Sequence, residues 1–186
     1  MVTKMIDWKF ITGEEKQLLT GYVPDPTTSH SGVTIATGVD LGQFQESHLD
    51  PLLGALRAKL DPYIGLKQQD AVTALAKAPL TVTQAEADAL DDIFHNVVMG
   101  PVEARYYMST AKQFSSLPDA VQTVVASVAY QYGPLWVHTP KFWATVVHSS
   151  WYGMASVLDN FGDDYKTRRE AEAAYLRKWL DTIPVA

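Results

Sequence analysis

The sequence contains no cysteine, and this absence restricts its chemistry more than any other feature of its composition. Without thiols the chain has no disulfide scaffold, no thiolate zinc site and no cysteine nucleophile. At 186 residues it needs no such cross-links, because a chain of this size buries about 70% of the surface that it exposes when unfolded. We therefore expect a fold that is held together by packing.

Long apolar runs are also missing. No window approaches about 18 consecutive apolar residues, so we expect no membrane span. The segment Met1–Lys16 lacks the apolar core behind basic residues that a signal peptide needs. We expect the protein to be made in the cytoplasm without a signal peptide. A target outside the cytoplasm then requires another route of delivery.

Positive charge is scarce as well. The chain carries 15 Lys and Arg against 21 Asp and Glu, a formal net charge of −6. Nucleic-acid binding relies on clustered Lys and Arg that neutralise phosphates, so we expect no nucleic-acid partner. The five histidines show no His-x-x-x-His spacing and no carboxylate-linked pattern. We therefore expect no metal site and no cofactor.

The overall composition is ordinary for a globular protein, with 47% hydrophobic and 19% charged residues. Residues 7–19 carry apolar side chains that predict a first helix. The segment 32–37 is short, β-branched and bracketed by glycines, which predicts a hairpin strand. Amphipathic or apolar patterns then predict helices over 52–60, 68–77, 83–97, 118–130, 142–158 and 167–180.

These elements predict an α+β fold that is predominantly helical. We expect one domain over residues 1–186, with a small N-terminal β-hairpin lobe at about 20–45 and a helical lobe at about 50–186. Thr83 and Glu86 have the spacing of a capping box and mark the start of a helix. The helix that Pro118 opens is apolar nearly all round from residue 121 to residue 130, which predicts the buried centre of the domain.

Two adjacent glutamates, Glu14 and Glu15, precede the predicted hairpin. Glycoside hydrolysis needs a carboxylic acid that protonates the leaving oxygen, and a second group that handles water on the opposite face of the sugar. A half-buried glutamate has a raised pKa that suits the first role. A Glu-Glu-Lys-Gln run is more often a solvated helix face, so the residues alone leave both interpretations open.

Hydroxyl and carboxylate side chains recur along the predicted hairpin and alternate with apolar or glycine residues. They are Ser29, Ser31, Thr34, Thr37 and Asp40. Because alternate residues of a strand share a face, one face can present these groups to a cleft. A polar outer face on an edge strand has the same pattern.

The hairpin residues resemble a known family. The run Gly21-Tyr-Val-Pro24, followed by Ser31-Gly-Val-Thr-Ile-Ala-Thr-Gly-Val-Asp-Leu-Gly-Gln43, closely resembles the muramidase domain of pesticin and related phage or bacterial toxin lysozymes. Weaker similarities follow in the chain order of coliphage-type lysozymes, and together they span about residues 10–180. They are Leu80-Thr81 to Leu90, Tyr130-Gln-Tyr-Gly133, and Asn160-Phe161 with Thr167-Arg-Arg169. The resemblance implies a lysozyme-like fold.

The resemblance also assigns roles to individual residues. It implies that Glu15 is the general acid, that Thr34 positions the attacking water and that Asp40 is the second carboxylate. It further implies that the glycan is contacted by Gln131, Tyr22 and Ser31. A hydroxyl that orients water favours an inverting mechanism, since a nucleophilic aspartate would not need it.

This chain departs from the family pattern around the acid. The family's glutamate is commonly followed by Gly, whereas Lys16 follows Glu15 here and Glu14 precedes it. Adjacent residues of a helix point about 100° apart, so only one of the two glutamates can face a cleft. Glu15 fits the register better, and Glu14 is the alternative acid. Asp25 is the alternative to Asp40 as the second carboxylate.

The family implies a muramidase that cuts the β-1,4 bond between N-acetylmuramic acid and N-acetylglucosamine in bacterial cell walls. The alternatives are an inactive cell-wall-binding module of the same fold and a lytic transglycosylase. The implied partners are peptidoglycan glycan strands and a cognate immunity or inhibitor protein, with the enzyme acting as a monomer. A phage endolysin released by a holin and a toxin delivered by a secretion system fit equally well.

A pair of arginines near the end of the chain, Arg168 and Arg169, has two interpretations. It can bind an anion, or it can form salt bridges on the surface of the last predicted helix. Adjacent arginines within an Ala-rich and Glu-containing helix favour the second interpretation. We therefore expect both side chains on the helix surface.

Overall fold

The computed structural model describes residues 6–13, 17–52 and 54–184. The chain divides into two compact units. One comprises residues 14–97, and the other comprises residues 1–13 together with 98–186. Each unit has its own cluster of buried apolar side chains. The grouping of all 186 residues into a single catalytic domain stays a prediction.

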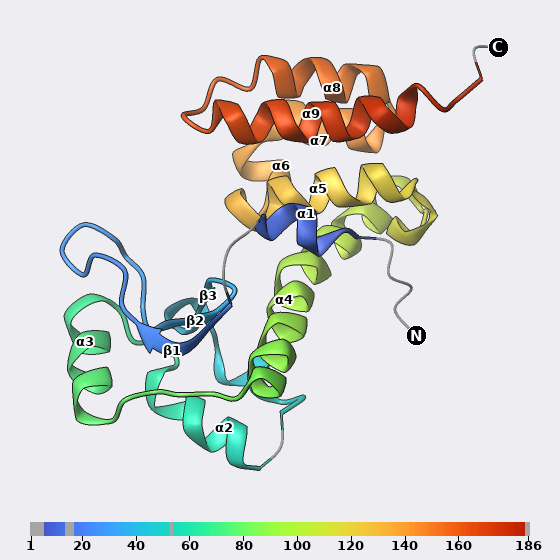
Figure 1. Cartoon of the computed structure of the whole chain (residues 1–186). Helices are drawn as coiled ribbons and strands as arrows, with labels where there is room; N and C mark the ends of the chain where they lie inside the picture. The colour runs from blue at the N-terminus through green and yellow to red at the C-terminus, as the bar shows by residue number, and fades with distance from the viewer. Residues whose placement is uncertain (1–5, 14–16, 53, 185–186) are drawn as a thin grey trace. The chain divides into compact units, whose positions relative to one another are not determined.

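The first unit is built on a small antiparallel sheet (Figure 1). Its strands are β1 (Leu18–Tyr22), β2 (Thr34–Ala36) and β3 (Val39–Asp40), in the order β1-β2-β3. The turn between β2 and β3 needs left-handed backbone, which Ala36 and Gly38 adopt with φ of 53° and 78°. The predicted hairpin strand is confirmed, with β1 as an additional partner on the other side of β2.

Helices and short helical turns make up much of the rest of this unit. They are α2 (Ala55–Leu60), α3 (Gln68–Lys77), the first half of α4 (Gln84–Thr110), and the short turns η1 (Leu41–Gln43), η2 (Glu46–Leu49) and η3 (Asp61–Tyr63). The capping box at the start of α4 is confirmed. The backbone N–H of Thr83 donates to Glu86 Oε2 at 2.7 Å, and that of Glu86 donates to Thr83 Oγ1 at 3.3 Å. The start of α4 is therefore fixed by its own sequence.

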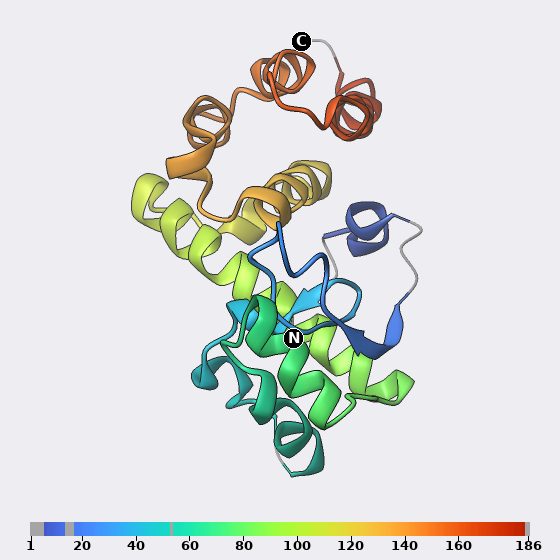
Figure 2. The same ribbon diagram turned by 90° about the vertical axis from the view of Figure 1, so that its left-hand side faces the viewer.

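The second unit is entirely helical in its described part. It contains α1 (Trp8–Thr12), η4 (Phe114–Ser116), α5 (Asp119–Tyr132), α6 (Leu135–His138), α7 (Pro140–Val147), α8 (Trp151–Asp159) and α9 (Lys166–Leu180). Every residue of α5 from Ala120 to Ala129 is buried, which confirms its predicted place at the centre. Figure 2 looks nearly along the axes of α7, α8 and α9, which lie side by side. The fold is thus α+β and predominantly helical, as predicted.

The prediction of a single helix over residues 7–19 is wrong. The helix begins at Asp7, whose side chain caps it by accepting from the Phe10 N–H, and α1 ends at Thr12. Gly13 follows with a φ of 64°, a value that glycine adopts readily and that does not continue a right-handed helix. The apolar Leu18, assigned to the helix face, instead begins β1.

The prediction of one helix over residues 142–158 is also wrong, because the chain breaks between α7 and α8. The N–H of Ser150 donates to the carbonyl of Thr145, and the N–H of Ser149 donates to the carbonyl of Val146. Ser149 has a φ of 54°. This bonding is a Schellman motif, with serine at the position that glycine usually occupies. Without glycine as a marker, the sequence gives little sign of the helix end.

Within the described ranges, none of the helices has the length and apolar character that a bilayer-spanning segment requires.

Candidate active site

Three of the predicted site residues form one cross-strand row on the sheet. Tyr22 of β1 pairs with Thr34 of β2, and Thr34 pairs in turn with Asp40 of β3. Residues directly opposite each other in antiparallel strands point to the same face, with Cβ atoms about 4.5–5.5 Å apart. The strand register therefore gathers an aromatic ring, a hydroxyl and a carboxylate on one face.

The Asp40 carboxylate is fixed mainly by backbone groups. Its Oδ1 accepts hydrogen bonds from the N–H groups of Gly32 and Gly42, each at 2.8 Å. The bond from Gly42 makes Asp40 the N-cap of η1. Its Oδ2 has a longer contact of 3.4 Å with Gln43 Nε2. Because this contact is weak, Oδ2 is the better placed oxygen to accept a proton from water.

Two glycines allow this arrangement because their backbones pass close together. A Cβ atom added to Gly32 would lie 2.6 Å from the Cα of Gly42 and 2.2 Å from the carbonyl oxygen of Leu66. A Cβ atom added to Gly42 would meet the same carbonyl oxygen at 2.6 Å. No side chain fits at either position, so the glycines of this motif are required by the close approach that presents their N–H groups to Asp40.

The neighbours of Asp40 differ in how firmly they are held. Thr34 is buried, with 4% of its surface exposed, and its Oγ1 donates to the carbonyl of Gly32 over a long 3.4 Å. Ser31 is half-buried and its carbonyl accepts from the Gln68 N–H at 2.9 Å. Tyr22 is 41% exposed. The Thr34 hydroxyl is therefore weakly committed within the protein, and the Tyr22 ring is accessible to a ligand.

The two candidate acids, Glu14 and Glu15, lie outside the described residues, so their assignment stays a prediction. The first described residue after them is Gln17, which is half-buried. Its Nε2 donates to Asp91 Oδ2 at 2.7 Å and to Asp88 Oδ1 at 3.0 Å. The chain is thus anchored to α4 two residues after Glu15.

Asp91 is a residue of this site that the sequence analysis missed. Its carboxylate also accepts from the backbone N–H and the Oγ1 of Thr37, at 3.0 and 2.7 Å. Asp91 could have been identified from the sequence by a polar stripe on the predicted helix. Gln84, Asp88 and Asp91 lie at positions i, i+4 and i+7, which share one helix face.

The alternative second carboxylate, Asp25, stabilises the loop in which it lies by hydrogen bonds to neighbouring residues. Its Oδ1 accepts from the N–H and the hydroxyl of Thr27 at 3.1 and 2.6 Å, and its Oδ2 accepts from the hydroxyl of Thr28 at 2.5 Å. These bonds, led by that of the Thr27 hydroxyl, lower the pKa of the exposed Asp25 carboxyl to about 2. Asp25 is occupied as the first residue of a hydrogen-bonded turn.

Gln131, a predicted glycan contact, lies on α5 of the second unit, where its Oε1 accepts from Arg169. Arg169 also pairs with Asp163, at 3.1 Å, and with Glu172. Only 2% of Arg169 is exposed, so the prediction that Arg168 and Arg169 both lie on the helix surface is wrong for Arg169. Its charge can be buried because two carboxylates and an amide surround it.

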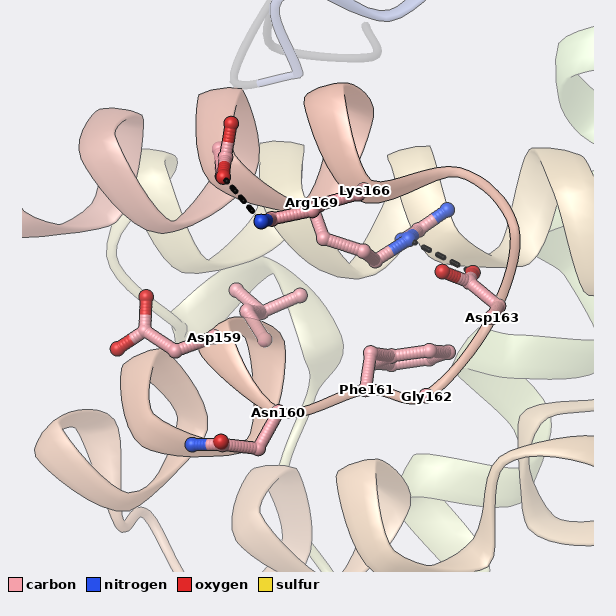
Figure 3. A pocket seen from close by; sticks show the side chains of 9 residues that line it. Asp159, Asn160, Phe161, Gly162, Asp163, Lys166 and Arg169 are labelled. Atoms are coloured by element: carbon pink, nitrogen blue, oxygen red, sulfur yellow. Dashed lines mark hydrogen bonds and ion pairs between the residues drawn. The ribbon is translucent and has the colours of Figure 1, made fainter.

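A pocket of about 380 Å³ lies at the loop between α8 and α9 (Figure 3). Its carboxylates already have cationic partners. Asp163 points toward Arg169 (Figure 3), while Asp159 pairs with Arg177 and Glu170 lies 3.8 Å from Lys166. The full lining is Leu158, Asp159, Asn160, Phe161, Gly162, Asp163, Lys166, Arg169 and Glu170. These pairs stabilise the loop and give no arrangement suited to hydrolysis.

Metal-ligating side chains do not gather in the part of the chain that the structure describes, where no group of three or more His, Asp or Glu could hold an ion.

His95 of α4 is mostly buried, and burial lowers its pKa although the charges of Asp91 and Asp92 oppose that shift. A neutral imidazole is thus favoured beside the acidic residues of α4.

The first unit has a small sheet whose last strand ends at Asp40, the cap of η1, and the second unit is helical. These are features of a lysozyme-like fold. Over residues 5–152 the chain matches the family described as "Pesticin: Bacterial toxin homologue of phage lysozyme, C-term". The match covers more than half of the 186 residues, and the chain belongs to this family. At the family level this defines a muramidase-type peptidoglycan hydrolase. A comparison with curated proteins finds no match.

Proposed function

We propose that this protein is an N-acetylmuramidase that hydrolyses the β-1,4 bond between N-acetylmuramic acid and N-acetylglucosamine. The observation that carries the proposal is the cross-strand row of Tyr22, Thr34 and Asp40 in a member of the pesticin family. The row supplies the water-handling half of a glycosidase site, namely a hydroxyl beside a carboxylate with one weakly bonded oxygen. Glu15 supplies the other half, as the general acid.

In the proposed reaction Glu15 donates its proton to the glycosidic oxygen while the bond from that oxygen to C1 of the muramic acid breaks. A water molecule attacks C1 from the opposite face, oriented by the Thr34 hydroxyl. Asp40 Oδ2 accepts the proton that this water loses as the new C–O bond forms. The products are a reducing N-acetylmuramic acid end and a free hydroxyl on the N-acetylglucosamine that leaves. In the same step Glu15 has lost one proton and Asp40 has gained one.

This mechanism inverts the configuration at C1. A water molecule needs space beside the sugar, which carboxyl groups about 6.5–9.5 Å apart provide, whereas a separation of about 5–5.5 Å leads to a covalent intermediate and retention. The weakly bonded Thr34 hydroxyl supports inversion, because a nucleophilic carboxylate needs no group to orient water. The first product from the β-linked glycan is then the α-anomer.

The hydrogen bonds favour Asp40 over Asp25 as the second carboxylate. Both oxygens of Asp25 accept hydroxyl protons at 2.6 Å or less, from Thr27 and Thr28. A carboxylate bonded in this way is a poor base, because hydrogen bonds to the charged form lower its affinity for a proton. Asp40 keeps Oδ2 weakly engaged and stands next to Thr34 in the sheet.

The proposed partners are the glycan strands of peptidoglycan and a cognate immunity protein that protects the producing cell. The protein acts as a monomer. Because its substrate lies in the cell wall, it must reach that compartment, either after holin-mediated release or through a secretion system. The family description as a bacterial toxin supports the second route.

Product analysis tests the proposal. Purified peptidoglycan is digested to completion, and the fragments are identified by mass spectrometry. Muramidase action yields reducing muramic acid ends, whereas a lytic transglycosylase yields anhydro-muramic acid. An inactive wall-binding module yields no fragments and co-sediments with the insoluble wall. Proton NMR of the first product then separates inversion, which gives the α-anomer, from retention, which gives the β-anomer.

A further inference from the structure

The polar face of α4 holds two segments that are distant in sequence. Gln84, Asp88 and Asp91 occupy positions i, i+4 and i+7 and therefore share one face of the helix. Ala87 and Leu90 are fully buried in the core of the same unit. The helix is thus held in place by its apolar side, while its polar side is directed to specific partners.

Asp91 is the residue where these partners meet. One carboxylate oxygen, Oδ1, accepts from the backbone N–H of Thr37 at 3.0 Å. The other, Oδ2, accepts from both the Thr37 hydroxyl and Gln17 Nε2, each at 2.7 Å. Hydrogen bonds to an ionised group are shorter and roughly twice as strong as those between neutral groups, so one side chain secures two loops.

The two loops are those that carry the proposed chemistry. Thr37 lies in the turn between Thr34 and Asp40. Gln17 follows Glu15 by two residues, and two residues of chain span at most about 7 Å. One carboxylate therefore joins the chain beside the proposed acid to the turn beside the proposed water-handling pair.

We infer that Asp91 is a positioning residue for hydrolysis, which holds Gln17, two residues after the proposed acid in the sequence, and the β2–β3 hairpin to one side chain. This inference rests on the proposed function. Asp91 acts through Gln17 and Thr37, and its own carboxylate has no role in proton transfer to the sugar. A misplacement of about 1 Å between reacting groups can cost about a hundredfold in rate, so a clamp of this kind has a measurable effect.

The variant Asp91→Asn separates the two halves of the clamp. The remaining Oδ1 can still accept from the Thr37 N–H. The new Nδ2 donates and cannot accept from Gln17 Nε2, so Gln17 loses its shorter bond, keeps the one of 3.0 Å to Asp88 Oδ1 and is held less firmly. We expect kcat to fall about tenfold or more, with KM changed less than about twofold, because the substrate still binds while the reacting groups are misaligned.

The matched control is Asp92→Asn, which removes the same charge from the next residue of α4, an exposed position. It is expected to leave kcat and KM near the wild-type values. A second pair of variants reverses donor and acceptor. Gln17→Glu alone is expected to lose kcat through repulsion with Asp91, and the double variant Gln17→Glu/Asp91→Asn is expected to recover part of it.

Hydrogen exchange followed by mass spectrometry tests the clamp without reference to activity. The peptide covering 17–22 is expected to exchange faster in Asp91→Asn than in Asp92→Asn, while the peptide covering 34–41, which keeps its bond from the Thr37 N–H, changes less. If Asp91→Asn fails to fold, Thr37→Val and Gln17→Ala test the two contacts separately by the same measurements. Unchanged exchange in these variants overturns the clamp.

The outcomes for activity keep the two proposals apart. If exchange increases while kcat of the active enzyme stays within about twofold of wild type, Asp91 anchors the loops without positioning the reaction, and the inference is wrong. If KM rises and kcat does not change, the inference is also wrong. If the wild-type protein does not cleave peptidoglycan at all, the proposed function fails, whatever the exchange data show.

Discussion

A methyl group at position 42 is expected to disrupt the close backbone approach of Gly32 and Gly42 that holds Asp40. In Gly42→Ala the new Cβ would lie 2.6 Å from the carbonyl oxygen of Leu66 and 2.7 Å from the Cα of Gly32. Both contacts are to backbone atoms, which cannot rotate away as the end of a flexible side chain can. The backbone around Gly42 must therefore move away from that of Gly32 and Leu66.

The cost follows from two effects. Forcing extra atoms into a packed region costs about 1–3 kcal/mol. The movement also weakens the two 2.8 Å bonds from Gly32 and Gly42 to Asp40, and a hydrogen bond to a charged group contributes about 1.5–3 kcal/mol. We expect Gly42→Ala to lose about 3 kcal/mol or more of unfolding free energy. For a protein of this size, that loss lowers Tm by about 6–12 °C.

Thermal and urea unfolding followed by circular dichroism measure this loss. The control is Gly100→Ala in α4, where an added Cβ meets no atom within 4 Å outside the adjoining residues and the backbone of its own helix. This control is expected to change the unfolding free energy by less than about 1 kcal/mol, because the entropy that alanine saves in a helix is opposed by crowding of its Cβ against the ring of Pro101. A Gly42→Ala protein within about 0.5 kcal/mol of wild type would show that the close approach of Gly32 and Gly42 does not require glycine.

Three further predictions concern charged groups. Asp40→Asn is expected to lower turnover on peptidoglycan at least about a hundredfold while Asp25→Asn keeps it; the reverse result would exchange their roles. The pKa of His95 is lowered by burial, so the unfolded chain binds the proton first, and stability should decline as pH falls through 6.5. Melting curves at about pH 7.5 and about pH 5.5 check this, and His95→Gln should show the smaller decline. Glu172→Gln leaves Arg169 short of a buried charged partner and should cost about 3–5 kcal/mol in urea unfolding, whereas a loss below about 1 kcal/mol contradicts that account.

Features that depend on a few neighbouring residues were predictable from the sequence. The capping box of Thr83 and Glu86 begins α4 as its spacing indicates, because each side chain bonds to the backbone of the other. The buried centre at α5 follows from its continuous apolar character. The glycines of the hairpin motif are explained by the close approach of Gly32 and Gly42, which leaves no space for a side chain at either position.

Features that depend on distant partners were not predictable in this way. The first helix ends at Thr12 and Leu18 enters a strand, because β2 offers a partner for pairing that local spacing cannot reveal. Arg169 is buried because Glu172 and Asp163, together with Gln131, surround its guanidinium. Sequence patterns give the polarity of a side chain, whereas its burial depends on the charges that tertiary structure brings to it.

Asp91 illustrates the same limit within the candidate site. Its place in a polar stripe of α4 can be found from sequence, but its partners Gln17 and Thr37 lie 74 and 54 residues away along the chain. The row of Tyr22, Thr34 and Asp40 likewise depends on strand register. Register fixes which side chains share a face, and it is set by the pairing of the strands.

The central claim is that Glu15 protonates the glycosidic oxygen, and adjacent glutamates offer a direct test of it. Glu15→Gln and Glu14→Gln each remove one carboxyl group at neighbouring positions, and release of soluble fragments from purified peptidoglycan measures their turnover. We expect Glu15→Gln to lose at least about a hundredfold in turnover with an unchanged melting temperature, and Glu14→Gln to remain close to wild type. Full activity in Glu15→Gln, with Glu14→Gln inactive, would move the acid by one residue, and full activity in both would contradict the mechanism.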